Sequence, residues 1–452
     1  MLLAVLFIIP VGAQQELDPA APPDFPEEAR YYFDAPKAKL AEPITQRDTL
    51  KFVHILYRHG DRAPSMLLPN DPNNGASSWP NGLSELTPKG IQQHHRLGKW
   101  LRNRYDTFLG KNFSRKDIYV RSSDYPRTIM SAQANLAGMF PTSLLDASKP
   151  DDWIPIPIHT VDKDRDIQLN EQLKCPNADA ALNAMNDDPK VHEIEEAHKD
   201  LLKYLEIHSG VKKPLRLRGM WAIFDALNCE YHHQDTHKWP DWMNATIWGR
   251  VQTLYDQSSQ FIFHNKQLRK LRGGALVAEI FERLQAKRNG TLDAKGPTKV
   301  YVYSAHDTTL AAFLSTFGIV PHVFPLYAST VILEMHNIAG QDIVEIYSKN
   351  VTDSGAIYQM EIPSCPAPCE VDFIKERLKE FYPTDWYAEC GRPNSSSTIP
   401  LWAIIFTLLM TNILCLAVIC VDVIIRRQSS PRLDPRRLLE EKLIADEEED
   451  ML

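Results

Sequence analysis

The sequence predicts an α/β fold: a mainly parallel sheet with flanking helices and an inserted helical cap, plus one transmembrane helix. Apolar, β-rich runs are each followed by a helical pattern, as in sheets covered by helices. The charge-rich stretch 165–298 is helical in pattern and offers few strand candidates. The uncharged run 401–421 is long enough to cross a hydrocarbon core of ~30 Å as a helix. A chain of 452 residues makes two or three units at roughly 150 residues per domain.

The composition excludes several classes of protein. Hydrophobic residues make up 44% and charged residues 24%, a globular mixture that can bury a substantial core. This excludes a wholly disordered chain, a collagen-like chain and a multi-span membrane protein. With 50 Lys and Arg against 58 Asp and Glu, the net charge is −8, so we expect no nucleic-acid partner.

The two ends predict the topology. Residues 1–13, MLLAVLFIIPVGA, are typical of a signal peptide, with a buried strand or helix as the alternative. The predicted membrane helix is 399–425, for which a core helix is the alternative. Arg426 and Arg427 follow at once, and by the positive-inside rule they place the tail 426–452 in the cytosol. We therefore expect a type I single-pass protein with a large lumenal or extracellular part.

Sequons and cysteines agree with an exported chain. All five Asn-x-Ser/Thr sequons lie between the two apolar runs, as expected for glycosylation of that part: Asn112, Asn244, Asn289, Asn350 and Asn394. Five of the seven cysteines also lie there, and because five is odd, at least one should lack an intrachain partner. Cys365 and Cys369 could close a small loop, or bind zinc as a CxxxC pair.

The elements are expected in the following order. Residues 14–49 are a Pro-rich exposed arm. Leu50–Tyr57 suits a central strand buried on both faces. Thr87 and Pro88 open a helix, as a capping residue and a first-position proline do. Further strands are expected at 117–121, 299–305, 331–335 and 342–347, and further helices at about 125–140, directly after 305, and at 374–381. The ectodomain spans 50–390 and a stalk, 391–398, leads to the membrane.

Reactive side chains follow three of these strands. Arg58-His59-Gly60-Asp61-Arg62 follows the first strand, Arg127 lies near the helix start after the second, and His306-Asp307 follow the third. In such sheets the reactive groups collect beyond the carboxyl ends of the strands. Three arginines and two histidines at one edge would form an oxyanion site, because each guanidinium donates two hydrogen bonds to one phosphate.

These residue types support phosphoryl transfer without a metal or another cofactor. A neutral imidazole, His59, can attack phosphorus and form a phosphohistidine. The arginines would neutralise the oxygens in the transition state. Asp307 could protonate the leaving alkoxide and then activate water.

The RHGDRAP motif resembles the signature of the histidine acid phosphatases, within the wider phosphoglycerate mutase-like group. The stretches 77–105, 121–141 and 301–314 also resemble the lysosomal and prostatic members, so the resemblance covers about 50–390. It implies a sheet domain with a helical cap, hydrolysis of small phosphomonoesters mostly at acid pH, and often a homodimer. By motif position it implies that His59 is the nucleophile and that Asp307 is the proton donor. It also implies four phosphate-binding residues, which are Arg58, Arg62, Arg127 and His306.

The resemblance also implies a disulfide pattern. The family usually has three disulfides, and two of them match Cys175–Cys390 and Cys365–Cys369 here. Cys229 matches half of the third, but Thr330 stands where its partner would be, so Cys229 is expected to be unpaired.

Three further features leave alternatives open. His94 and His95 are expected to be surface or supporting residues. The cluster His232, His233, Asp235 and His237 is expected to be a polar loop away from the strand ends, with a metal site as the alternative. In the tail, Leu438 and Leu439 fit an acidic dileucine signal for sorting adaptors, which favours endosomal or lysosomal membranes over the plasma membrane.

The predicted function is that of a membrane-anchored acid phosphatase. A phytase-like phosphatase and a catalytically silent receptor or adhesion ectodomain are the alternatives.

Overall fold

The computed structural model describes most of the chain between residues 37 and 429. The described residues are 37–41, 47–73, 75, 77–110, 112–141, 155–170, 172–212, 214–292, 296–350, 355–363, 365–392, 401–429 and 436. The expected signal peptide, most of the stalk, Asn394, Leu438 and Leu439 lie outside them.

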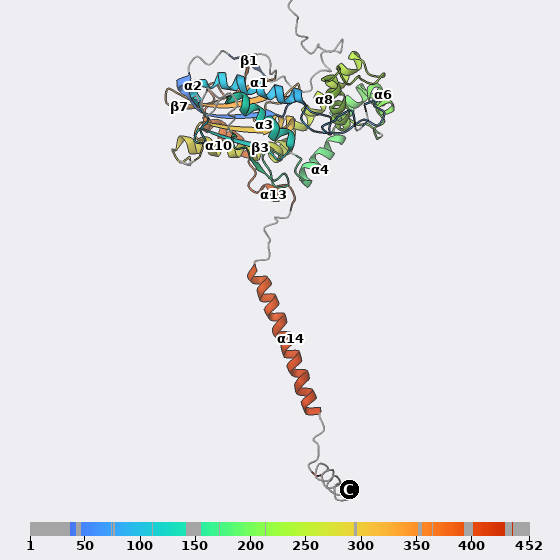
Figure 1. Ribbon diagram of the computed structural model, residues 1–452, viewed down its shortest axis with the longest axis vertical. Coiled ribbons are helices and arrows are strands. Elements are labelled where there is room, and N and C mark those ends of the chain that lie inside the picture. Colours follow the sequence, from blue (N-terminus) through green and yellow to red (C-terminus); the bar gives the residue numbers. More distant parts are fainter. Residues whose placement is uncertain are drawn as a thin grey trace, which may run out of the picture. The chain divides into compact units, whose positions relative to one another are not determined.

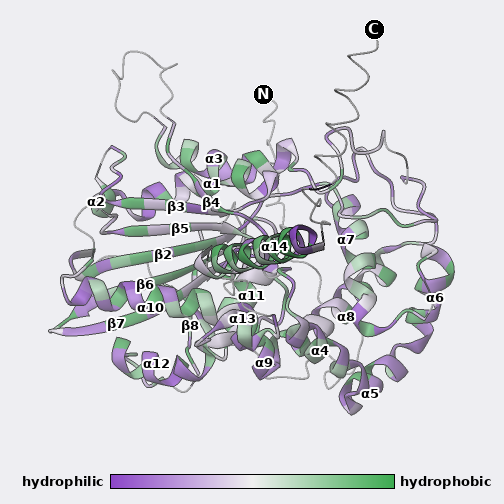
Figure 2. Cartoon of the chain, turned by 90° about the horizontal axis from the view of Figure 1, so that it is seen from below, coloured by the Kyte–Doolittle hydropathy of each residue, from purple (hydrophilic) through white to green (hydrophobic). Residues whose placement is uncertain are grey.

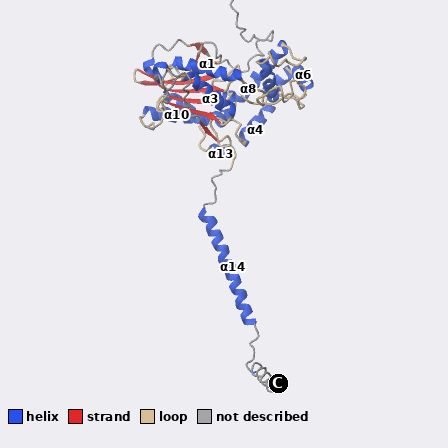
Figure 3. Ribbon diagram, in the orientation of Figure 1, coloured by secondary structure: helices blue, strands red, loops and turns tan. Residues whose placement is uncertain are grey.

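One eight-stranded sheet forms the centre of the fold (Figures 1 and 3). Its order is β1-β8-β7-β6-β2-β5-β3-β4. The strands are β1 (Ala38–Leu40), β2 (Leu50–Arg58), β3 (Ile118–Ser123), β4 (His159–Val161), β5 (Val300–Ala305), β6 (Thr330–Ile338), β7 (Gln341–Lys349) and β8 (Tyr358–Met360).

Helices cover both faces of this sheet. One face packs on α1 and α3 through a cluster that includes Val53, Leu97 and Leu136. The other packs on α10, α11 and α12 through a cluster that includes Phe52 and Phe313. The helices are α1 (Pro88–Arg104), α2 (Asp106–Leu109), α3 (Pro126–Met139), α4 (Pro176–Ala184), α5 (Pro189–Ala197), α6 (Lys199–Ser209), α7 (Met220–Tyr231), α8 (Ala245–His264), α9 (Lys266–Leu268), α10 (Ala275–Arg288), α11 (Asp307–Thr316), α12 (Val371–Leu378), α13 (Trp386–Glu389) and α14 (Leu401–Ser429).

The α/β class is confirmed, but the sheet is mixed and not mainly parallel. Strands β2, β5, β3 and β4 are parallel, whereas β2–β6, β6–β7, β7–β8 and β8–β1 pair antiparallel. A two-residue hairpin joins β6 to β7, and both of its residues, Ala339 and Gly340, have positive φ, 51° and 87°. Such turns match the twist of antiparallel strands, and they are too short for a parallel crossover.

Part of the expected arm belongs to the sheet. β1 pairs with β8 and adds an edge strand, so the expectation that the arm stays outside the folded sheet domain through residue 49 is wrong for this segment. Backbone hydrogen bonds hold it: the Ala41 amide donates to the Ile357 carbonyl at 2.8 Å and the Glu361 amide to the Lys37 carbonyl at 2.9 Å. Because all three residues of β1 are exposed, no apolar pattern marked the strand in the sequence.

The helical region, formed by α5 to α8, has a hydrophobic core of its own, whereas α10 from the expected cap does not belong to it. Helices α5 to α8 share a cluster that includes Leu205, Ile223 and Leu254, and Figure 1 shows α4, α6 and α8 beyond one end of the strands. The expected cap ran to residue 298, but α10 lies on the sheet, where Ile280 and Leu284 join the cluster of Phe52. Apolar residues on a buried helix face recur with the same spacing whether the helix packs on the sheet or in the cap, so the sequence could not show on which of the two α10 lies.

The chain divides into two units, residues 1–392 and 393–452. The second contains α14, and the most apolar 18-residue stretch within Trp402–Ser429 has a mean hydropathy of 2.7. Figure 2 shows this helix as hydrophobic along most of its length. By length and composition it can cross a membrane.

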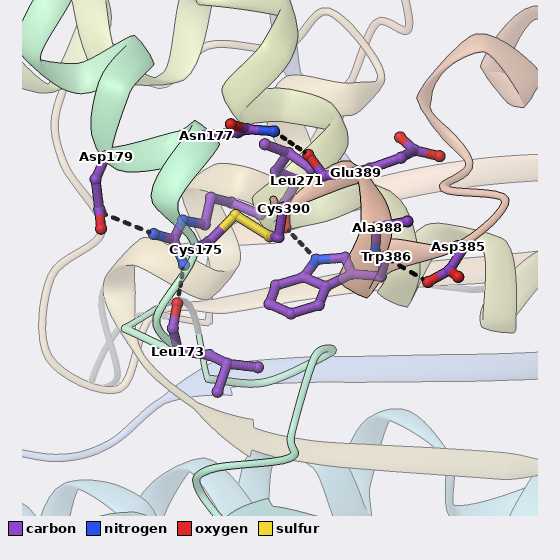
Figure 4. The surroundings of a disulfide bond; sticks show 11 residues. Leu173, Cys175, Asn177, Asp179, Leu271, Asp385, Trp386, Ala388, Glu389 and Cys390 are labelled. Carbon is purple, nitrogen blue, oxygen red and sulfur yellow. Dashed lines mark hydrogen bonds and ion pairs between the residues drawn. A yellow bond between two sulfur atoms is a disulfide. The ribbon is translucent and has the colours of Figure 1, made fainter. Parts of the chain in front are cut away.

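Two disulfides join described residues of the first unit. Cys175 pairs with Cys390 and Cys365 pairs with Cys369, as the resemblance implied, and Cys229 is a buried free thiol. Beside the first bond, the Trp386 indole donates to the Leu271 carbonyl at 2.8 Å, and this fixes α13 on the π-helical turn before α10 (Figure 4). Four sequon asparagines are exposed: Asn112, Asn244, Asn289 and Asn350.

Candidate active site

The parallel half of the sheet brings the reactive segments together. Arg58 at the end of β2 pairs with Ala305 at the end of β5, and β3 lies on the other side of β5 with Ser122 opposite Ser304. The residues that follow therefore meet at one edge. The rings of His59 and His306 lie 5.6 Å apart, edge to face.

His59 is a buried neutral imidazole in a cationic setting. Its Nδ1 lies 2.8 Å from the Gly60 carbonyl oxygen, which can only accept, so Nδ1 carries the proton and Nε2 keeps its lone pair. Burial lowers its pKa well below the ordinary value, and the charges of Arg127, Arg58 and Arg62 lower it further. Both effects favour the neutral ring, which is the form of imidazole that can act as a nucleophile.

The backbone after His59 packs closely against α1. A methyl group on Gly60 would lie 2.4 Å from the Gly90 carbonyl oxygen, so only glycine fits there. The next residue, Asp61, donates its amide proton to Gln93 at 2.8 Å and accepts a hydrogen bond from the Thr87 hydroxyl. Gly60 thus allows the loop formed by residues 59–62 to lie directly on the first turn of α1.

Arg58 is oriented by three partners. Its Nη1 donates to the Pro325 carbonyl at 2.8 Å and its Nη2 pairs with Asp307 at 2.9 Å. Its guanidinium carbon lies 4.3 Å from the centre of the Tyr327 ring, a cation–π contact. No feature of the sequence indicated that Pro325 and Tyr327, in the segment between α11 and β6, would contact Arg58.

Arg62 and Arg127 are held in different ways. The Arg62 fork binds Asp225 on α7, with Nη2 at 2.6 Å and Nη1 at 3.3 Å from the carboxylate oxygens. Arg127 is the second residue of α3, beside the helix N-terminus that favours anions. Its guanidinium lies 4.7 Å from the centre of the Tyr125 ring.

His306 and Asp307 lie at the start of α11. The His306 Nε2 lies 2.9 Å from the Ser123 hydroxyl at the end of β3. Burial and the charges of Arg127, Arg62 and Arg58 lower the pKa of His306 well below its ordinary value. The side chain of Asp307 is 20% exposed, so it can meet both Arg58 and a bound substrate. All six residues expected at the site therefore lie together.

Two histidines have supporting positions: His94, for which this was one of the two expectations, and His233, which was not expected near the strand ends. His94 on α1 is fully buried and donates from Nε2 to the Arg58 carbonyl at 2.9 Å. His233 lies 2.6 Å from the Asp61 carboxylate, so the expectation that its cluster lies away from the strand ends is wrong. The turn after α7 that carries His233 therefore contacts the loop formed by residues 59–62, and spacing along the chain gives no sign of that contact.

Among the described residues, one carboxylate and histidine group has ligand-like spacing: Glu334, His336 and Glu345. It lies at the opposite end of β2, because His336 pairs with Leu50. Glu334 is already bound by Arg104 at 2.9 Å and by the Tyr105 hydroxyl at 2.5 Å. The group is therefore a hydrogen-bonded charge network far from His59.

Comparison with known proteins agrees with the geometry of this site. Residues 49–354 match the family model described as Histidine phosphatase superfamily (branch 2). The chain belongs to this family. The human lysosomal acid phosphatase is 34% identical, covering 86% of this chain and 91% of its own, and the human prostatic acid phosphatase is 33% identical, covering 76% and 89%. A Caenorhabditis elegans protein named as an acid phosphatase is 42% identical, covering 81% of this chain and 85% of its own.

Solved structures show the same fold at low identity. The Citrobacter braakii phytase superposes with a TM-score of 0.56 at 16% identity, covering 76% of this chain and 99% of its own. The Hafnia alvei phytase in complex with myo-inositol hexakis sulphate gives the same TM-score, identity and coverage. These structures show the fold alone; the family match and the relatives at 33–42% identity make the chain a histidine phosphatase of the acid phosphatase type, a phosphoric monoester hydrolase.

Proposed function

We propose that this chain is a membrane-anchored acid phosphatase that hydrolyses phosphomonoesters through a phosphohistidine at His59. The observation that carries the proposal is the distance of 2.8 Å between the Nδ1 of His59 and the Gly60 carbonyl oxygen, which places the ring proton on Nδ1. This hydrogen bond leaves the Nε2 lone pair available and keeps the ring orientation fixed. The surrounding guanidinium groups attract a phosphate dianion while they keep the imidazole unprotonated.

The reaction has two steps. Nε2 of His59 attacks phosphorus, and the bond to the leaving oxygen breaks while Arg58, Arg62, Arg127 and His306 bind the phosphoryl oxygens. Asp307 in its protonated form gives its proton to the leaving alkoxide. Water then attacks the phosphohistidine, Asp307 takes the proton from that water, and inorganic phosphate leaves.

Membrane anchoring is supported by α14 and by Arg426 and Arg427 near its end. A lysosomal or endosomal membrane is supported by the similarity to lysosomal acid phosphatases and by the tail motif at Leu438 and Leu439. The anchor is tested by alkaline carbonate extraction, in which the full chain should stay in the membrane pellet and a chain ending at Arg392 should not.

The substitution His59→Ala tests the chemistry. We expect aryl phosphate hydrolysis at acid pH, measured with a chelator present, to fall by at least about 10³-fold, as expected when a nucleophile is lost. His192→Ala is the matched control, because this histidine is exposed on α5. The wild type should also form an acid-labile, alkali-stable phosphoenzyme. Activity that survives His59→Ala would show that His59 is not the nucleophile.

The same preparation separates the alternatives. A catalytically silent ectodomain would give no phosphoenzyme. A phytase-like enzyme would hydrolyse inositol hexakisphosphate faster than a simple monoester.

A further inference from the structure

Asp256 on α8 is an acidic side chain that the proposed mechanism does not use. It is half-buried and faces the segment that joins α11 to β6. One of its carboxylate oxygens accepts the backbone amide proton of Phe324 at 3.0 Å. The Phe324 ring is itself buried, in a cluster with Phe263 of α8 and Ala311 of α11. The backbone at Phe324 is therefore held by a hydrogen bond on its amide and by packing on its ring.

The next residue makes the connection to the phosphate site. The Pro325 carbonyl accepts the Arg58 Nη1 hydrogen bond at 2.8 Å. Proline has a fixed φ, so the peptide unit before it and its own carbonyl carbon move together, and only ψ of Pro325 still sets the direction of the carbonyl oxygen. A displacement of the Phe324 amide would therefore move the acceptor of Arg58.

Arg58 depends on this acceptor because its other one changes during the reaction. Its second hydrogen-bond partner is Asp307, at 2.9 Å. In the proposed mechanism Asp307 carries a proton when the substrate binds, and a protonated carboxyl binds a guanidinium more weakly than a carboxylate does. The Pro325 carbonyl is the partner that stays unchanged through both steps.

We propose that Asp256 is a positioning residue for phosphate binding: it holds the Phe324 amide, which fixes the Pro325 carbonyl and thereby the direction of the Arg58 guanidinium. This inference rests on the proposed role of Arg58 in binding phosphate. Asp256, which lies on a helix of the helical region, would thus act on the phosphate site at the edge of the sheet through two backbone groups, the Phe324 amide and the Pro325 carbonyl.

The test compares two substitutions in the full-length chain, purified in non-ionic detergent. Asp256→Leu removes the acceptor, whereas Asp256→Asn keeps a side-chain carbonyl oxygen in the same place. We expect Asp256→Leu to raise the inhibition constant for inorganic phosphate and KM about 10- to 100-fold, because a displaced binding group costs that much. We expect Asp256→Asn to stay within about threefold of the wild type, because it still accepts the bond.

A matched control separates positioning from general loss of stability. Asp188 also accepts one backbone amide proton, from Lys190 at 2.8 Å, but it caps α5 in the helical region. Asp188→Leu should lower the melting temperature and leave the phosphate inhibition constant unchanged. If Asp256→Leu does not fold, the smaller Asp256→Ala removes the same acceptor and is measured in its place.

Three results would overturn the inference. The first is a phosphate inhibition constant equal to that of the wild type in folded Asp256→Leu or Asp256→Ala. The second is a rise of this constant in Asp256→Asn as large as that in Asp256→Leu. The third is a rise of the same size in Asp188→Leu. Arg58→Gln distinguishes a deeper failure: if this variant binds phosphate as the wild type does, the proposed role of Arg58 is wrong and this inference fails with it.

Discussion

The ion pair between Arg62 and Asp225 should be a major contributor to the stability of the loop formed by residues 59–62. Both side chains are largely buried, at 8% and 12% exposure. Asp225 accepts two hydrogen bonds from the Arg62 fork and a third from the Ser65 amide at 2.7 Å. Burial by itself raises the pKa of Asp225, but the charge and hydrogen bonds of Arg62 outweigh it and lower the pKa below its ordinary value.

Replacing Asp225 with leucine leaves the Arg62 charge buried and without a carboxylate. Removal of one partner from such a pair typically costs about 3–5 kcal/mol of unfolding free energy. Since the pKa of Asp225 is lowered in the folded state, this contribution is fully present above the ordinary carboxyl pKa of about 4 and is lost only as the pH falls below it. The pair therefore stays intact at the acid pH proposed for catalysis.

Urea unfolding at about pH 5, followed by tryptophan fluorescence, measures this cost. The matched control is Asp200→Leu, which removes the Arg250 partner from a more exposed pair, with Asp200 66% exposed, and should cost less than about 1 kcal/mol. A loss below about 1 kcal/mol for Asp225→Leu, or one equal to that of Asp200→Leu, would refute the reasoning.

Two further predictions concern the same edge of the sheet. Gly60→Ala places a methyl group 2.4 Å from the Gly90 carbonyl oxygen, so we expect kcat/KM on an aryl phosphate to fall about 100-fold. Gly355→Ala is the control, because its methyl group meets no atom within 4 Å and should leave kcat/KM unchanged. Equal activities of the two variants would contradict the packing argument. Burial raises the pKa of Asp256 to about 7. Between about pH 4 and pH 7 the unfolded chain loses this proton while the folded chain keeps it, so the free energy of unfolding should fall by about 2–4 kcal/mol over that range. Urea unfolding of Asp256→Asn should show a smaller fall over the same range.

The sequence predicted which residues meet at the site because they are local to strand ends. Arg58, His59 and Arg62 form one motif after a buried strand, and Arg127 and His306 follow two others. Parallel strands bring such ends to one edge whatever the details of packing. The long uncharged run of α14 was equally visible, since length and hydropathy alone decide whether a helix can span a membrane.

Strand direction and the arm were less accessible to sequence reasoning. An apolar run does not show whether its neighbour runs parallel or antiparallel, so the hairpin at Ala339 and Gly340 was needed to show the mixed sheet. The exposed strand β1 has only backbone hydrogen bonds to mark it.

By itself, the sequence determined which side chains gather at the edge of the sheet, the class of fold and the apolar helix, since each depends on residues that are neighbours along the chain. Only the tertiary structure decided what holds those groups in place. Asp225 is 163 residues from Arg62, and Pro325 is 267 residues from Arg58. A carboxylate or a carbonyl can accept a hydrogen bond from any donor in reach, so residue type gives no sign of the partner until the fold has placed the two atoms together.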